Sequence, residues 1–298
     1  MTYRKLSYMN SKNEMIEFNV ENVEVFLFEI TGMGFSYLNE ITDTNYQNVR
    51  KLVSTKNETN EITGRLEIIK KTNREIYATE LEIASILNYD QLQIRRGQNV
   101  YGKLLYQNAT GRQIFIPCLI KGFIFGETND VEGYLHLPIE VTFERLTRVW
   151  YNYAPTIYHF EMEGGTAHGH PYNHPYSHMK PAGFGNVGVL SGNDLAKFNL
   201  EITGYFSNFT LTFTNMDTQE EQRIVYLGNI SGDETLIVDN FNLSIRKNGV
   251  TDMRNIDLIE GNSPFFDLMP KARYSFKFDA AILEGRVRMY IYESWVSV

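Results

Sequence analysis

Short segments in which apolar and polar side chains alternate recur along the chain, and this period of two constrains the fold more than any other feature. They extend from residues 16–30 to residues 286–296 of a 298-residue chain. Turn-forming residues separate them, as at Asn248-Gly249, where a type I′ turn needs two positive φ angles. We therefore expect a mainly β fold made of short antiparallel strands.

The first half of the chain predicts an N-terminal β-domain, a barrel or a sandwich with one α-helix, over residues 1–153. Residues 16–30 predict two short strands, and the polar residues 40–64 predict a long loop or extended arm. Apolar spacings of three and four predict a helix over 73–87, which Thr72 or Asn73 caps and Asn88 ends. Strands then resume with LQIRR at 92–96 and continue to Trp150.

Residues 154–183 differ from the rest of the chain, because they hold four of the eight Pro and five of the six His. This composition predicts a linker or a protruding loop. Residues 184–298 contain no His and alternate again, which predicts a second domain, an antiparallel β-sandwich. A chain of this length can bury two separate hydrophobic cores.

Composition excludes several classes of function. The net charge of -8 and the absence of a basic stripe argue against nucleic-acid binding. No apolar stretch has the length of a signal peptide or a membrane span, so we expect no membrane partner. Cys118, the single Cys, lies in the apolar run FIPCLI and is expected to be a buried thiol. The aromatic content of 13% favours sheet surfaces and protein interfaces.

A histidine cluster is the arrangement that most resembles a chemical site. The candidate metal ligands are His168, His170, His174 and His178. However, Pro171 and Pro175 exclude a helix that would align these side chains, and no Cys or acidic residue completes a ligand set within the tandem. We favour a solvated contact loop in which Tyr172 and Tyr176 are the candidate docking residues.

Nothing in the sequence predicts an enzyme or a cofactor site. The chain has no G-x-S-x-G, no P-loop and no dinucleotide fingerprint. Acidic pairs such as Asp233-Glu234 lie in turn-like sequence without the apolar setting that raises the pKa of a catalytic acid. We therefore expect no catalytic residues.

The second half resembles the galectin-like domain of distal tail (Dit) proteins of phages with long non-contractile tails. The resemblance is carried by NVGVLSGNDLAKFNLEITGYFSNFTLTFTN (186–215), GDETLIVDNFNLSIRKNG (232–249) and the closing segments ARYSFKFDA and RVRMYIYESWV. The first half is similar in its order of elements, from the β-alternating start through the 73–87 helix to Trp150.

This resemblance implies a structural virion protein of the tail tip or baseplate hub, assembled in the bacterial host cytoplasm. It implies a homo-hexameric ring built from N-terminal domains, with C-terminal domains that project as docking platforms. The implied partners are copies of the chain, the tail tube protein, tail-tip proteins and receptor-binding or baseplate proteins. The acidic balance suits a ring through which DNA passes.

The alternative is a carbohydrate-binding module for the host cell wall. Galectins hold sugars with a His-x-Asn-x-Arg strand and a Trp platform. The chain keeps Asn242, Arg246 and Trp295, but residues 184–298 have no His. We therefore favour the structural platform over a functional lectin.

Overall fold

The structure is a computed structural model that describes residues 5–18, 25–33, 37–44, 49–57, 61–108, 111–162, 184–256, 263–280 and 282–296. The chain divides into two compact units, Met1–Ala154 with Trp295–Val298, and Pro155–Ser294. Each unit has its own hydrophobic core. The mainly β fold predicted from the sequence is confirmed.

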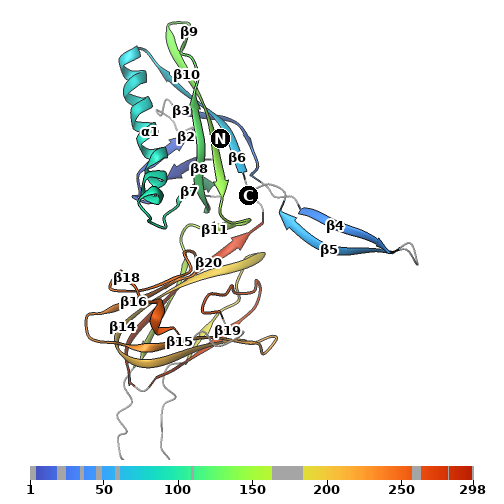
Figure 1. The fold of residues 1–298 in the computed structure, drawn as a ribbon, viewed down its shortest axis with the longest axis vertical. Coiled ribbons are helices and arrows are strands. Elements are labelled where there is room, and N and C mark those ends of the chain that lie inside the picture. Colours follow the sequence, from blue (N-terminus) through green and yellow to red (C-terminus); the bar gives the residue numbers. More distant parts are fainter. Residues whose placement is uncertain are drawn as a thin grey trace, which may run out of the picture. The chain divides into compact units, whose positions relative to one another are not determined.

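One antiparallel sheet forms most of the first unit (Figure 1), in the order β2–β1–β7–β8–β10–β6–β3. Two short strands join it, β9 beside β10 and β11 beside β8. Its strands are β1 (Lys5–Met9), β2 (Met15–Phe18), β3 (Val25–Thr31), β6 (Glu61–Lys70), β7 (Gly102–Gln107), β8 (Gln113–Phe125), β9 (Asn129–Val131), β10 (Tyr134–Arg145) and β11 (Trp150–Asn152). The first half of β8 pairs with β7 and the second half with β10, so this strand joins both parts of the sheet.

Helix α1 (Asn73–Arg95) packs its apolar side against the inner face of this sheet through Ile76, Ile83, Ile86 and Leu87. At its start Thr72 Oγ1 accepts from the Glu75 backbone N–H, and the Glu75 carboxylate accepts from the Thr72 backbone N–H. This capping box confirms Thr72 as the N-cap. No helix in the described residues combines the length and the apolar character needed to cross a membrane.

The predicted end of the helix at Asn88, and the predicted strand at 92–96, were wrong, because α1 continues to Arg95. The added turns carry Asp90, which is fully buried. The Tyr8 hydroxyl donates to Asp90 Oδ2 at 2.9 Å, and the Ser11 backbone N–H donates to Oδ1 at 3.0 Å. The last turns of the helix are therefore stabilised by distant residues and not by their own apolar pattern.

Most of the segment predicted as a long loop or extended arm, residues 40–64, forms strands, so the loop alternative was wrong, whereas a separate two-stranded ribbon is compatible with an extended arm. β4 (Tyr37–Thr44) and β5 (Val49–Asn57) pair with each other in a two-stranded antiparallel sheet. In a two-stranded ribbon, backbone hydrogen bonds between the strands satisfy the peptide groups, so the sequence does not need alternating apolar and polar residues. The search for alternation therefore missed these two strands.

The second unit is an antiparallel β-sandwich built around one 22-residue strand, β14 (Asp194–Asn215). Its first half lies in the sheet β12–β20–β14–β16–β17–β18, and its second half lies in the sheet β13–β19–β14–β15. The other strands are β12 (Thr156–Met162), β13 (Phe184–Val187), β15 (Glu221–Ile230), β16 (Thr235–Asp239), β17 (Ser244–Lys247), β18 (Val250–Thr251), β19 (Tyr274–Asp279) and β20 (Ile282–Trp295). A short 3-10 helix covers Met253–Asn255.

Two glycines allow β14 to change sheets. Gly204 lies opposite Gly285 in the β14–β20 pairing, and their φ angles are +123° and +153°. A Cβ on Gly204 would lie 2.4 Å from the Glu284 carbonyl oxygen, so a larger residue cannot enter without a backbone shift.

The predicted Asn248-Gly249 turn is confirmed, with φ angles of 49° and 79° between β17 and β18.

Aromatic side chains fill the sandwich between its two sheets. The core includes Phe198, Phe206, Phe209, Phe213 and Phe278, all at most 1% exposed.

Residues Thr156–Met162, expected to be part of a 154–183 linker, form β12 and pair with β20.

Candidate functional site

The histidine-rich segment predicted as a contact loop lies outside the residues that the structure describes. This applies to His168, His170, His174 and His178 and to Tyr172 and Tyr176, whose roles stay predictions. His159 is exposed on β12, and His136 on β10 places Nδ1 3.3 Å from Glu67 Oε1. Over the described ranges, no three His, Cys, Asp or Glu side chains converge as metal ligands would.

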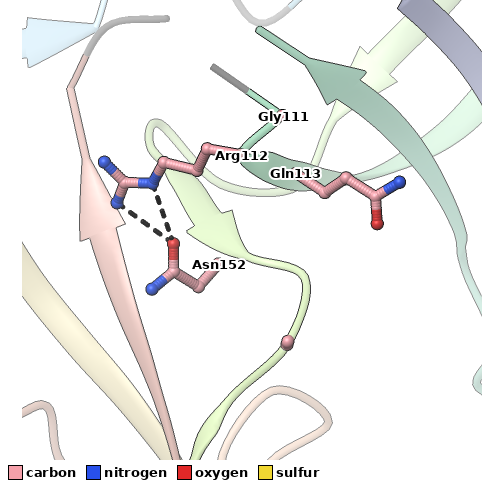
Figure 2. Close-up of a pocket in the computed structure, with 5 residues that line it drawn as sticks. Gly111, Arg112, Gln113 and Asn152 are labelled. Carbon is pink, nitrogen blue, oxygen red and sulfur yellow. Dashed lines mark hydrogen bonds between the residues drawn. The ribbon is translucent and has the colours of Figure 1, made fainter.

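A shallow hollow of about 360 Å³ lies at the start of β8 in the first unit (Figure 2). Its lining consists of Gly111, Arg112, Gln113, Asn152 and Ala154. Figure 2 shows the Arg112 and Asn152 side chains pointing toward one another, while Gln113 points away. These five residues include no carboxylate, thiol or imidazole, so the hollow itself supplies neither a general base nor a nucleophile.

Arg112 is held from two sides. Its Nε and Nη2 donate to Asn152 Oδ1 at 3.3 and 3.1 Å, and its guanidinium carbon lies 3.3 Å from the centre of the Trp295 ring. A guanidinium over an indole ring makes a cation–π interaction together with apolar contact. Sequence reasoning named Trp295 but missed Arg112 and Asn152, since nothing near either residue in the sequence indicates the contact.

Polar and aromatic side chains gather on the outer face of the β12–β20–β14–β16–β17–β18 sheet of the second unit. Arg288 Nη1 donates to Glu201 Oε1 at 3.1 Å, and the Tyr290 hydroxyl donates to Glu201 Oε2 at 2.8 Å. Strand register places His159 next to Arg288 and Asn199 next to Tyr290. Strand alternation explains the grouping, because every second residue of these strands faces away from the core.

The ionisable side chains of this face, Glu201, Arg288 and Tyr290, are joined by hydrogen bonds. Partial burial, followed by the hydrogen bond to Glu201, raises the pKa of Tyr290, so its hydroxyl stays a donor at neutral pH. The Glu201 carboxylate therefore accepts hydrogen bonds from two donors on the neighbouring strand, an arrangement that suits binding or stability.

The galectin-type residues are divided between the two units. Asn242 lies in the β16–β17 turn, where its Nδ2 donates to Asp239 Oδ2 at 2.6 Å. Arg246 lies on β17, opposite Ile237. Trp295 belongs to the first unit, under the Arg112 guanidinium.

The thiol of Cys118 lies in the core of the first unit and is fully buried, as the sequence predicted. Burial raises the pKa of this thiol above its ordinary value. The thiolate that a nucleophilic cysteine needs is therefore disfavoured at neutral pH.

Comparison with solved structures found the same fold in phage baseplate proteins, although no family model and no curated protein sequence matched the chain. A chain of the phage p2 baseplate, in its activated conformation with Ca, matches with a TM-score of 0.60 and 13% identity. The Sr form of that baseplate gives a TM-score of 0.61 and 13% identity. Both matches cover 97% of this chain and 98% of the other chain.

The Dit protein of phage SPP1, described as a paradigm of the hub adsorption apparatus in phages that infect Gram-positive hosts, matches with a TM-score of 0.57 and 7% identity. Here too the match covers 97% of this chain and 98% of the other. Such low identities show the fold alone, and that fold agrees with the resemblance seen in the sequence. Over nearly its whole length the chain has the Dit-like fold of phage baseplate hub proteins.

Proposed function

We propose that the chain is a structural virion protein, the distal tail protein of a phage with a long non-contractile tail. It assembles into a homo-hexameric ring that joins the tail tube to the tail-tip and receptor-binding or baseplate proteins. The observation that carries this proposal is the match to a chain of the phage p2 baseplate and to the SPP1 Dit protein, each across 97% of this chain. A likeness confined to one unit would support only a shared domain.

The division into two units supports this role. A ring former that also carries partners needs one surface for its own copies and another for the partners. In this proposal the first unit forms the ring and the second unit, a galectin-like sandwich, is the docking platform. In the same proposal, Tyr172 and Tyr176 of the histidine-rich segment contact a partner.

The proposed role is not enzymatic, and the described polar clusters support that reading. The Asp90 carboxylate accepts from Tyr8 and Ser11 inside the first unit. The Asp252 carboxylate accepts from the Tyr226 hydroxyl at 2.6 Å in the second. Both carboxylates connect neighbouring elements, as structural groups do.

Mass photometry and electron microscopy of the purified full-length chain test the proposal. We expect particles at six times the 34.5 kDa mass of one chain, and six-fold rings in projection. A chain that stays monomeric at high concentration would count against the ring. A matched measurement in high salt reports how much of the assembly depends on surface charge.

A second candidate function is binding of host cell-wall polysaccharide by the outer face that carries Glu201, Arg288 and Tyr290. It is favoured by that group of polar hydrogen-bonding side chains beside an aromatic ring on an accessible sheet. The test is a sedimentation assay of the full chain with cell-wall polysaccharide. Arg288→Ala should reduce binding, while Arg223→Ala, on β15 of the other sheet, should not. Equal binding by both variants, or none by the wild type, removes this candidate.

A further inference from the structure

Helix α1 carries apolar side chains on the side that faces away from its own sheet. Its inner side packs on the first core, whereas Tyr77, Leu81 and Leu92 are 61%, 53% and 43% exposed. The helical repeat places these three side chains on one line along the helix, which Figure 1 shows beside the sheet. Ser85 and Asn88 lie between Leu81 and Leu92 on the same line, and the five residues form the outer stripe of α1. A surface helix usually has a polar outer side, so an apolar stripe indicates contact with another chain.

The middle of the outer stripe consists of two small polar residues. Ser85 is exposed and Asn88 is half-buried. The Ser85 hydroxyl donates to the Glu82 carbonyl oxygen at 2.8 Å, so its oxygen is left to accept a hydrogen bond from another group. The Asn88 side-chain amide is a donor of the matching kind. Small side chains here let a second helix approach closely, and the two groups can satisfy one another across the contact.

Charge is distributed unequally along α1. Residues 74 and 75 carry opposite charges, and Glu80 and Glu82 then make the first half of the helix acidic. Arg95 in the last turn and Arg96 at the C-cap make the other end basic, and both are exposed. Two copies of α1 that lie antiparallel bring the acidic half of each beside the basic end of the other, whereas parallel copies bring like charges together. The charges therefore favour an antiparallel pair.

We propose that the outer stripe of α1 binds the outer stripe of a second copy of this chain, with the two helices antiparallel. A two-fold axis at the middle of the stripe brings Leu81 of each copy against Leu92 of the other, because the two leucines are equally distant from that axis. Ser85 of each copy then meets Asn88 of the other beside the axis. One stripe thus supplies both halves of the contact, as a two-fold interface requires.

The ends of the stripe are complementary in the same arrangement. The axis brings Tyr77 of each copy beside Arg96 of the other, where a guanidinium can lie over the ring. It also brings Glu80 close to Arg95 at the rim. A two-fold contact closes after two copies, so it is separate from the contacts of a ring, and the inference does not depend on the proposed role in a phage tail.

The size of the stripe sets the strength of the contact. A helix of 23 residues is about 35 Å long and about 10 Å wide, so each copy buries roughly 350 Å². Stable dimers bury about 800 Å² per partner. Pairing of two free chains is therefore weak, and a test has to trap it covalently at high protein concentration.

Disulfide trapping of the full-length chain tests the contact. Ser85→Cys and Asn88→Cys chains are purified separately, mixed, oxidised and run on a non-reducing gel. The mixture should give a covalent pair at twice the 34.5 kDa mass of one chain. Burial protects Cys118 from reaction. The matched control mixes Ser85→Cys with Glu132→Cys, an exposed position in the β9–β10 turn, and should give much less product.

Charge reversal tests the antiparallel arrangement. Glu80→Arg with Glu82→Arg, added to both cysteine chains, places like charges at both rims and should lower the trapped yield about threefold. Arg95→Glu with Arg96→Glu should lower the yield by a similar factor. All four changes together place opposite charges at both rims again and should restore the yield. Circular dichroism checks that each variant keeps its helix.

Substitution of the exposed leucines tests the apolar part of the contact. Leu81→Glu in both cysteine chains removes two leucines from each pair and should lower the trapped yield about tenfold. Leu92→Glu is measured in the same way, so that the test survives if one variant does not fold. A yield no higher than in the Glu132→Cys control, or a yield that neither leucine variant lowers, would overturn the proposal and assign the outer stripe to a partner of different sequence. Failure of the fourfold charge variant to restore the yield would reject the antiparallel arrangement.

Discussion

At the scale of single residues, Asp90 links α1 to the β1–β2 hairpin. Its carboxylate accepts from the Tyr8 hydroxyl and from Ser11, and all of it is buried. Asp90→Ala leaves the Tyr8 hydroxyl buried without its acceptor, so we expect the free energy of unfolding to fall by about 2–4 kcal/mol. Chemical denaturation measures this change.

The control for that prediction is Asp233→Ala, which removes an exposed carboxylate from a turn of the second unit and should change stability by less than about 0.5 kcal/mol. Tyr8→Phe removes the donor, and in combination with Asp90→Ala it gives the coupling energy of the pair. Equal stability of Asp90→Ala and the wild type would show that this hydrogen bond contributes nothing.

Buried tyrosines predict a loss of stability in alkali. Burial first, then the hydrogen bond to an aspartate, raises the pKa of Tyr226 above its ordinary value of 10.0, and burial with the Asp90 charge does the same for Tyr8. Their contribution to stability is therefore complete below pH 10 and decreases as the pH rises above it. Tyrosinate absorbance and circular dichroism, recorded together, should show these rings ionising as the chain unfolds. Ionisation of all 19 tyrosines near pH 10 with the fold intact would contradict this.

At the scale of elements, the capping box at the start of α1 is a local signal with a measurable effect. Thr72→Ala removes the acceptor for the Glu75 N–H and should lower the free energy of unfolding by about 1 kcal/mol, whereas Thr72→Ser keeps the acceptor. Hydrogen bonding to Thr72 lowers the pKa of Glu75, so acid should weaken the cap as Glu75 is protonated. Similar denaturation midpoints for the alanine and serine variants would argue against the cap.

Sequence reasoning succeeded where the stabilising partner is near in the chain. Thr72 and Glu75 are three residues apart, and Asn248-Gly249 forms its turn through its own φ angles. It failed at the far end of α1, because Asp90 is stabilised by Tyr8, which is 82 positions away. A buried polar residue at such a place looks like a helix end until the distant donor is known.

At the scale of the whole molecule, the same limit applies to the candidate site. The sequence predicts β-rich domains because alternation is local, and the structure confirms a mainly β fold. Arg112 could not be found in this way, since β8, β11 and β20 meet there only after the chain has folded. When the partners of a residue are far from it in the sequence, no local pattern around that residue indicates the contact.

Two separate cores predict two unfolding transitions. Leu87→Ala removes a fully buried side chain from the first core, and Phe213→Ala removes one from the second. Each should destabilise its own unit by about 3–5 kcal/mol, because a cavity remains in a packed interior. Distant sites that share no partners change stability independently, so the other unit should keep its stability.

The two tryptophans make these transitions distinguishable, because Trp150 and Trp295 both belong to the first unit. Trp fluorescence therefore follows the first unit during denaturation, whereas circular dichroism follows the strands of both. Leu87→Ala should shift the fluorescence transition, and Phe213→Ala should shift only the remaining part of the circular dichroism signal. If Phe213→Ala shifted the fluorescence transition equally, the chain would unfold as one cooperative body, and the expectation of two independent transitions would be wrong.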